Sequence, residues 1–397
     1  MGRYKGKFER GSGNRVRREE EQPARTQQPV QTPVYYEPQP VVTEEEPVMQ
    51  PAAKKKMSTG LKIVLIFMLV IALLAIAVLG YTYHLLNKLD RTEYSGEPGL
   101  SYADMIGEAD LQNMDADSAE IMHQADNAFE SLKGLDMLEN DNDIVNYLII
   151  GTDRRDDSYM GNSDTMIIMS LNKKTDKIHL TSLMRAMYVS IPKDSGTVNG
   201  MLNWAYSMGG PELLVKTVEE NFKVEIDHYA AIDFNSFEAI VDAVGGVEIE
   251  LSYDEASWIN KKTGIAACYE GTQILTGEQA LWYSRCRSVG NDFVRTSRQR
   301  NVIESIIRGA GSLSLTQITE LANTLLPAIN TDMTNTEVLG EALHVLEYAT
   351  YPIDQMMLPI ENQDGEHYVG MITIGGHEMY SVDWNTNLPA LQEFISE

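Results

Sequence analysis

Arginine is unevenly distributed along the chain, and its positions indicate a local anion-binding site. From Lys88 onward there are ten arginines, and those after Arg91 fall in three short segments, although the chain as a whole carries a formal charge of −26. A guanidinium group is planar and fits two phosphate oxygens at once, and each charge-assisted hydrogen bond contributes about 1.5–3 kcal/mol. The alternative, pairing with surface carboxylates, accounts less well for a whole set gathered in this way.

Two aspartates indicate where a metal ion would join this anion site. Asp153 follows one short apolar segment and Asp164 precedes the next, eleven residues later. Because consecutive strands commonly lie side by side, both carboxylates can face one pocket. Hard oxygen ligands near a phosphate favour Mg²⁺, with Mn²⁺ as the alternative.

The segments around these residues predict an α/β domain. A buried strand over 144–150 runs into the turn that presents Asp153, and 165–171 and 177–183 form a hairpin. Further strands are expected over 228–234 and 246–252. Helices are expected over 116–138, 211–222, 235–244, 276–283 and 296–310. Alternating elements of this kind predict a central mixed β-sheet covered by helices on both faces.

One segment has the length and composition of a membrane span. Residues 63–87 contain no Asp, Glu, Lys or Arg and exceed the ~20 residues that a bilayer requires. Lysines 54–56 and Lys62 precede the segment, which places the N-terminus in the cytoplasm. A cleaved signal peptide is the competing interpretation, but the apolar run is too long and lies too far from the N-terminus. We therefore expect a single-pass protein of the cell membrane whose C-terminal domain is extracytoplasmic.

Composition divides the chain into four parts. Residues 1–56 are rich in proline and polar residues and predict a disordered cytoplasmic tail. A transmembrane signal-anchor helix over 61–87 follows, then an extracytoplasmic linker and spacer helix over 88–142, and the α/β domain over 143–397. The acidic balance excludes a nucleic-acid partner held by a basic face. The chain has no Cys-x-x-Cys spacing, so there is no zinc signature.

Cys268 and Cys286 are the only cysteines, and both lie outside the membrane in this topology. A disulfide between them would close a loop of about eighteen residues and contribute roughly 3 kcal/mol in the chain-entropy model. We treat this bridge as a hypothesis, with two free thiols as its alternative.

A series of motifs runs through the predicted domain. They are Gly151-Thr152-Asp153-Arg154-Arg155, Ser163-Asp164-Thr165-Met166, Asn203-Trp204-Ala205-Tyr206, Gly209-Gly210-Pro211, Asp233-Phe234, residues 241–247 and 275–281, Arg285-Cys286-Arg287, Asp292-Phe293, and Arg295 with Arg298-Gln299-Arg300. In order and rough spacing these motifs resemble the LytR-CpsA-Psr (LCP) family. The resemblance is dense over residues 143–306 and weaker toward the C-terminus.

The resemblance implies an extracytoplasmic phosphotransferase. Such an enzyme moves a glycopolymer, for example teichoic acid or capsular polysaccharide, from a polyprenyl-pyrophosphate carrier onto a hydroxyl group of peptidoglycan. The carrier is embedded in membrane lipid, and the product is linked by a phosphodiester. The resemblance further implies that Asp153 and Asp164 hold Mg²⁺. The arginines implied in catalysis are Arg155, Arg185, Arg285 and Arg287, and the residues implied in pyrophosphate binding are Arg295, Arg298, Gln299 and Asn203. The apolar helices after Gly210 and Asn235 form either plain core or a lipid tunnel.

Three positions depart from the family's pattern, and each removes a charge. Asn162 stands where the family usually has Arg, Ala186 where it has Asp, and Met201 where it has Lys. These changes leave open a second hypothesis, a catalytically weak or inactive protein that binds lipid-linked pyrophosphates and has a regulatory role in envelope assembly. A direct regulator of genes is disfavoured because the N-terminal tail has no helix-turn-helix pattern.

Overall fold

The computed structural model describes residues 68, 80–81, 83–84, 87–88, 105–138, 143–153, 161–314, 317, 326, 329–361, 365 and 367–397. The predicted cytoplasmic tail and Arg155 lie outside these residues, as does most of the predicted membrane segment. No helix within the described residues is long and apolar enough to cross a bilayer.

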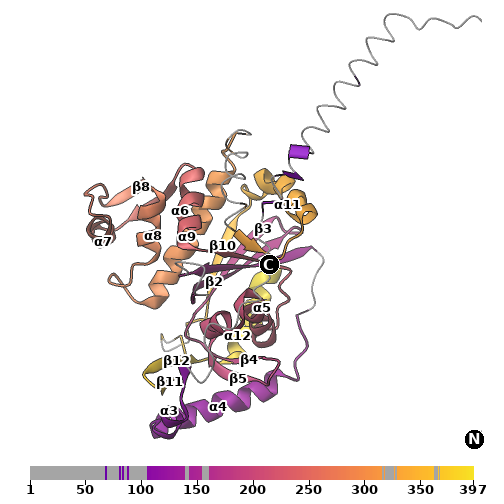
Figure 1. The fold of residues 1–397 in the computed structure, drawn as a ribbon, viewed down its shortest axis with the longest axis vertical. Coiled ribbons are helices and arrows are strands. Elements are labelled where there is room, and N and C mark those ends of the chain that lie inside the picture. Colours follow the sequence, from indigo (N-terminus) through magenta and orange to yellow (C-terminus); the bar gives the residue numbers. More distant parts are fainter. Residues whose placement is uncertain are drawn as a thin grey trace, which may run out of the picture. The chain divides into compact units, whose positions relative to one another are not determined.

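A six-stranded mixed sheet forms the centre of the domain (Figure 1). Its order is β10-β3-β2-β1-β6-β9, with β1/β6 and β3/β10 parallel and the other pairs antiparallel. The predicted strand over 144–150 and the hairpin over 165–171 and 177–183 are confirmed. The strands are β1 (Ile144–Thr152), β2 (Ser163–Asn172), β3 (Lys177–Leu183), β6 (His228–Ile232), β9 (Ile329–Thr331) and β10 (Ile353–Leu358).

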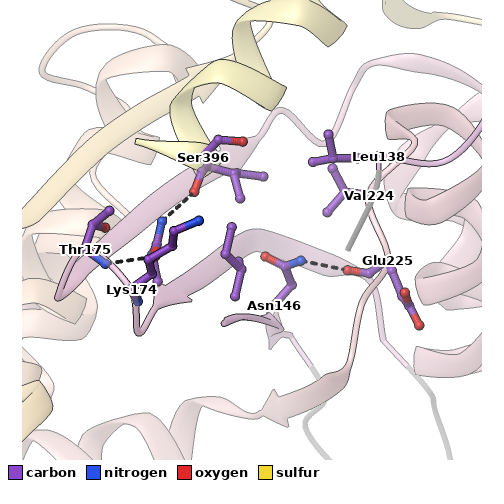
Figure 2. Close-up of a pocket in the computed structure, with 10 residues that line it drawn as sticks. Leu138, Asn146, Lys174, Thr175, Val224, Glu225 and Ser396 are labelled. Atoms are coloured by element: carbon purple, nitrogen blue, oxygen red, sulfur yellow. Dashed lines mark hydrogen bonds between the residues drawn. The ribbon is translucent and has the colours of Figure 1, made fainter. Parts of the chain in front are cut away.

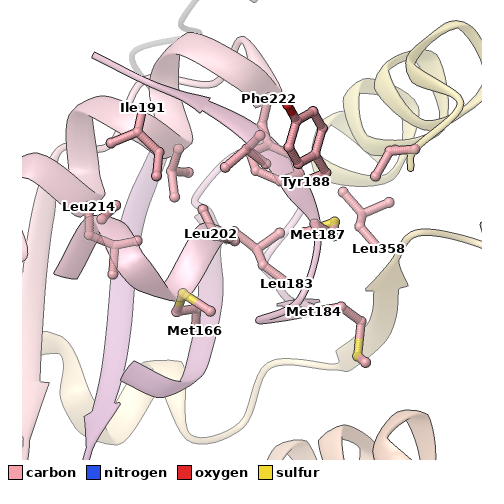
Figure 3. Close-up of a cluster of buried hydrophobic side chains, with 14 of the residues drawn as sticks. Met166, Leu183, Met184, Met187, Tyr188, Ile191, Leu202, Leu214, Phe222 and Leu358 are labelled. Carbon is pink, nitrogen blue, oxygen red and sulfur yellow. The ribbon is translucent and has the colours of Figure 1, made fainter. Parts of the chain in front are cut away.

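Helices cover both faces of this sheet, as the sequence predicts. Alternate side chains of one strand enter different cores: Met166 of β2 joins the core on one face, and Ile167 joins the core on the other. The first core, shown in Figure 3, is completed by α5 (Leu202–Phe222) and α12 (Trp384–Ser396). The second is covered by α9 (Asp292–Ala310) and α11 (Asn335–Tyr348).

Helix α5 begins earlier than the sequence predicts. The prediction starts at residue 211, whereas the element starts at Leu202 and is interrupted by non-helical backbone at Gly209 and Gly210. Gly210 has φ of +66°, a conformation that suits glycine, and Pro211 restarts the helix at a position where its missing N–H is not needed. The early turns of α5 thereby bring Asn203 and Trp204 to the region of the candidate site.

A small module with its own core is inserted between β6 and α9. It comprises α6 (Phe234–Ala243), β7 (Val247–Leu251), α7 (Tyr253–Thr263), β8 (Gly271–Leu275) and α8 (Gly277–Ser284). The predicted strand over 246–252 belongs here, paired only with β8 and not with the central sheet. Val302 of α9 packs into the core of this module, while Ile303 packs against the sheet. Helix α9 therefore joins the two bodies of the fold.

The opposite side of the domain is built from hairpins and the first helices. Phe129 of the predicted helix over 116–138 contacts the rings of Tyr188 and Trp384 at 5.7 and 6.4 Å between centroids. This helix is thus packed into the main core. The elements of this side are α3 (Glu108–Gln112), α4 (Ala116–Leu132), β4 (Tyr188–Ile191), β5 (Val198–Met201), β11 (Gly370–Ile374) and β12 (His377–Ser381).

Gly277 lets α8 approach α6 closely. A Cβ at this position would lie 2.3 Å from the backbone oxygen of Glu238. Gly277→Ala therefore forces the helices apart, and we expect it to lower the free energy of unfolding by about 1–3 kcal/mol, the usual cost of overpacking. Urea-induced unfolding of the full chain, followed by tryptophan fluorescence, measures this change.

Gly340→Ala is the matched control. Gly340 lies in α11, and no described heavy atom is within 4 Å of the place its Cβ would take. The added methyl group meets nothing there and alanine favours helix, so stability should be unchanged or rise by up to about 1 kcal/mol. Equal effects of the two substitutions would contradict the close contact between α6 and α8.

Candidate active site

Five charged side chains gather where β2 begins and β3 ends, and two of them, Asp292 and Arg295, come from helix α9. Arg185 Nη1 lies 2.7 Å from Asp164 Oδ1, and Arg185 Nε lies 3.3 Å from Asp292 Oδ2. Arg287, half exposed, reaches toward the same two carboxylates at 3.7 and 3.6 Å. Arg295 binds Asp292 through Nε at 2.7 Å and Nη2 at 3.2 Å. Three cations thus face two anions, and the surplus is positive.

Asp292 is the centre of this cluster because all three guanidinium groups reach it. Burial acts to raise the pKa of its carboxyl group, but Arg295, Arg185 and Arg287 outweigh burial, and the pKa is lowered. For Arg295 burial is the larger effect: it lowers the pKa of the guanidinium group, although the negative charge of Asp292 acts to raise it. The family resemblance includes Asp292, but residue type alone does not assign it a role. Its spacing of three residues from Arg295 at a helix start was the available signal.

A β-bulge in the central sheet determines how the side chain of Asp164 is oriented. The register between β1 and β2 shifts after Gly151, and Asp164 is the extra residue on β2. A bulge of this kind redirects the side chain of the unpaired residue. Asp153 follows β1 directly, and its Oδ1 accepts a hydrogen bond of 2.6 Å from the Asn162 backbone. The two predicted metal ligands therefore flank adjacent strand ends, as expected.

Two carboxylates are few ligands for a metal ion. Within the described part of the chain, no three His, Cys, Asp or Glu side chains form a group that could hold one. Mg²⁺ is nevertheless commonly bound by one or two carboxylates together with substrate phosphates and water. Asp153 and Asp164 fit that pattern only if a bound phosphate supplies further oxygens.

A cavity of about 590 Å³ opens beside the charged cluster, and we call it the apolar cavity. Its polar end is formed by Asp164, Arg285, Arg287, Arg295 and Gln299. The rest is lined mainly by apolar side chains of the sheet, of α6, of α8 and of α9. They include Ile149, Met169, Phe234, Phe237, Ile240, Trp258, Leu281, Trp282, Ile303, Ile306 and Ile307.

Arg285 lines this cavity and lies against two of its aromatic side chains. Its guanidinium carbon lies 4.4 Å from the ring centre of Phe234 and 5.1 Å from that of Trp282. Such cation–π contacts hold a charge beside apolar walls. The helix after Asn235 contributes Phe237 and Ile240 to the cavity. The helix after Gly210 packs into the main core instead and is not among the elements that line this cavity.

Arg298 differs from the other predicted arginines. Its side chain is 4% exposed and its Nε lies 2.6 Å from Glu255 Oε1. Its remaining nitrogens donate to the backbone oxygens of Cys286 and Val289. The structure thus places its guanidinium against the loop that follows α8, and not among the residues that line the apolar cavity. It positions the loop that carries Arg287.

A second cavity, of about 550 Å³, meets the first at Arg287, and we call it the polar cleft. Asn203, predicted to bind substrate, lies here. All three positions that depart from the family's pattern line this one cleft. Its lining residues are Asn162, Arg185, Ala186, Met201, Asn203, Trp204, Arg287, Asp292, Gly376, His377, Glu378 and Tyr380.

Cys268 and Cys286 are both free thiols in this structure, which is the alternative to the hypothesised bridge. Cys268 packs into the core of the inserted module, where Asn260 anchors its backbone on both sides. The Cys286 sulfur instead lies 3.8 Å from the Ser288 hydroxyl. The loop that carries Cys286 is held by Arg298 in place of a covalent bridge.

A third cavity, of about 210 Å³, lies at the other end of β1 and is shown in Figure 2. Asn146 donates a hydrogen bond of 3.0 Å to the Glu225 backbone there. Seven residues of extended chain separate Asn146 from Asp153, or about 23 Å. This cavity contains none of the arginines of the charged cluster.

Comparison with known proteins identifies the class of this fold and site. The LytR_cpsA_psr family matches residues 108–385, more than half of the chain. The chain therefore belongs to the LytR_cpsA_psr family.

Individual relatives share this region. The chain is 36% identical over 210 residues to the polyisoprenyl-teichoic acid–peptidoglycan teichoic acid transferase TagU of Oceanobacillus iheyensis, covering 51% of this chain and 62% of TagU. It is 32% identical over 202 residues to biofilm regulatory protein A of Streptococcus mutans, covering 49% of each. The matches thus span less than two-thirds of these curated relatives. The solved structure of gbs0355 from Streptococcus agalactiae is similar with a TM-score of 0.54 and 26% identity, covering 64% of this chain and 86% of that one.

Asp292→Asn tests the charged cluster because it removes the shared negative charge and keeps the side-chain shape. We expect the free energy of unfolding to fall by about 2–4 kcal/mol at pH 7, since three guanidinium groups lose a buried partner. The lowered pKa means that the carboxylate stabilises the wild type above about pH 4, and that this stabilisation disappears as pH falls through the lowered value. Urea unfolding of the wild type and of Asp292→Asn at several pH values between 7 and 3 measures both free energies of unfolding, and we expect the difference between them to become smaller as the pH falls.

Asp194→Asn in the exposed loop between β4 and β5 serves as the control and should change stability by less than about 0.5 kcal/mol. A difference between wild type and Asp292→Asn that stays constant down to pH 3 would contradict the assigned role of Asp292.

Proposed function

We propose that the protein is a membrane-anchored extracytoplasmic phosphotransferase. It attaches a polyprenyl-pyrophosphate-linked glycopolymer, a teichoic acid or a capsular or secondary wall polysaccharide, to peptidoglycan. The observation that carries the proposal is an apolar cavity of about 590 Å³ that ends at Arg285, Arg287 and Arg295. An amphiphile with a long hydrocarbon chain and an anionic head suits this cavity. The name of TagU, a relative of this chain, supports the same reaction.

The arginines offset the negative charge that the pyrophosphate carries during the proposed transfer. The acceptor hydroxyl oxygen forms a bond to the phosphorus that carries the glycan, and the pyrophosphate P–O bond breaks. Polyprenyl phosphate leaves, and the hydroxyl proton is released. Arg287 and Arg285 face the negative charge on the pyrophosphate, and Arg295 and Arg185 hold the cluster in place through Asp292 and Asp164. Prearranged cations of this kind stabilise developing charge without reorganisation.

We propose Mg²⁺ as the cofactor, with Mn²⁺ as a substitute. Asp153 and Asp164 would hold it, and it would neutralise phosphate oxygens during transfer. The support is the position of the two carboxylates at adjacent strand ends, where Asp164 also contacts Arg185 and Arg287.

The assay uses the full chain in detergent with a polyprenyl-pyrophosphate-linked disaccharide and an uncrosslinked peptidoglycan oligomer. Release of polyprenyl phosphate and formation of the joined product are followed with Mg²⁺ or with EDTA. We expect metal-dependent product, and a loss of about 100-fold or more in turnover with Arg287→Ala, the size typical of removing one charge-stabilising group. Lys133→Ala at the exposed end of α4 is the control and should retain wild-type turnover.

The second candidate function is lipid-pyrophosphate binding with little or no catalysis, in a regulatory role. It is favoured by the absence of charge at Ala186 and Met201, and by the name of the Streptococcus mutans relative. In the assay above, tight donor binding without product from several donors and acceptors would select this function and contradict the transferase.

The proposed anchor is a single helix over 61–87, with the N-terminus in the cytoplasm. It would confine the protein and its lipid-borne donor to one surface and raise their effective concentration. We expect protease added outside intact cells to digest residues after 88 and to spare an epitope placed at the N-terminus. Digestion of that epitope in intact cells would show that the N-terminus lies outside the cell and would contradict the proposed topology.

A further inference from the structure

The polar cleft has a surface chemistry that suits a sugar ring. Trp204 at the start of α5 and His377 of β12 meet edge to face, with ring centres 5.3 Å apart and an interplanar angle of 85°. Tyr380 adds a third aromatic group, stacked on Tyr368 at 4.9 Å. Sugar rings present C–H groups that pack on aromatic carbons and hydroxyls that need polar partners, and a pocket with a few placed polar groups supplies both.

Asn203 provides a polar group that the folded chain leaves unused. Asn203 is 7% exposed, and its Oδ1 has no hydrogen-bond partner among the residues that the structure describes. A buried amide oxygen without a partner costs about 1–3 kcal/mol. A hydroxyl or amide N–H of a ligand in the cleft would satisfy this oxygen.

The position of the cleft relative to the apolar cavity assigns it to the attacking substrate. The two cavities meet at Arg287. In phosphoryl transfer the attacking and leaving oxygens lie roughly in line on opposite sides of the phosphorus. When the lipid phosphate leaves into the apolar cavity, the attacking hydroxyl arrives from the side away from that cavity, and the polar cleft is a described cavity that also borders Arg287.

The walls of the cleft favour an uncharged ligand. Ala186 and Met201 contribute no charge, and the acidic side chain of Glu378 disfavours an anion. Arg185 and Asp292, which are charged, are already bound to each other at 3.3 Å. A strongly anionic chain would find little unpaired positive charge here besides Arg287, which serves the pyrophosphate.

We propose that the polar cleft binds an uncharged N-acetylated sugar of the acceptor glycan and directs its hydroxyl toward Arg287. The amide N–H of the acetyl group is a suitable donor for Asn203, and the rings of Trp204 and His377 hold the sugar. This proposal rests on the proposed transferase function and identifies the acceptor subsite.

Kinetics of the full chain in detergent test this assignment, with the same lipid-linked donor and uncrosslinked peptidoglycan oligomer. His377→Ala removes one aromatic wall, and Ala186→Glu places a charged side chain in the cleft. We expect each variant to raise the KM for the oligomer by about tenfold or more while the KM for the donor changes by less than about twofold. Tyr269→Ala, which removes an exposed aromatic residue of the inserted module, should change neither KM.

An unchanged KM for the oligomer in both variants would overturn the acceptor site, as would an equal rise in the KM for the donor. If the wild type yields no product, binding of the oligomer alone is measured by tryptophan fluorescence. Binding that is lost in His377→Ala and Ala186→Glu then supports the cleft while the transferase function fails. No binding by the wild type overturns the cleft assignment itself.

Discussion

The site depends on holding several guanidinium groups close together without mutual repulsion. Arg185, Arg287 and Arg295 would repel one another in a partly buried place, and Asp292 and Asp164 offset that repulsion. The two carboxylates leave a positive surplus. The cluster is thus stable enough to be assembled in the folded chain and still able to attract an anion.

Helix α9 is the element through which the fold supplies this arrangement. Its first turns carry Asp292 and Arg295, and its middle carries Arg298, which holds the loop that bears Arg287. The same helix packs against the central sheet through Ile303 and against the inserted module through Val302. A disturbance of the contact between sheet and module therefore reaches the arginines directly.

Two cavities of different character meet at one arginine, and this division matches the chemistry of the proposed reaction. The apolar cavity suits a hydrocarbon carrier, and the polar cleft suits a sugar that brings a hydroxyl. Arg287 borders both, where charge would develop on the transferred phosphoryl group. Membership of the LytR_cpsA_psr family agrees with this arrangement, and the three departures from the family's pattern all fall on the cleft side.

The sequence by itself determined four of the six central strands, the helices on both faces, and the position of Asp153 close to the strand end that carries Asp164. These features follow from local hydrophobic periodicity and from pairing of neighbouring segments. Only the tertiary structure decided that Arg295 faces the apolar cavity whereas Arg298, three residues later, is bound to Glu255, and that Cys268 and Cys286 remain thiols. It also decided that Asp292, 107 residues from Arg185, joins three arginines. Such choices depend on which distant side chains pack around each group, and neither residue type nor spacing along the chain contains that information.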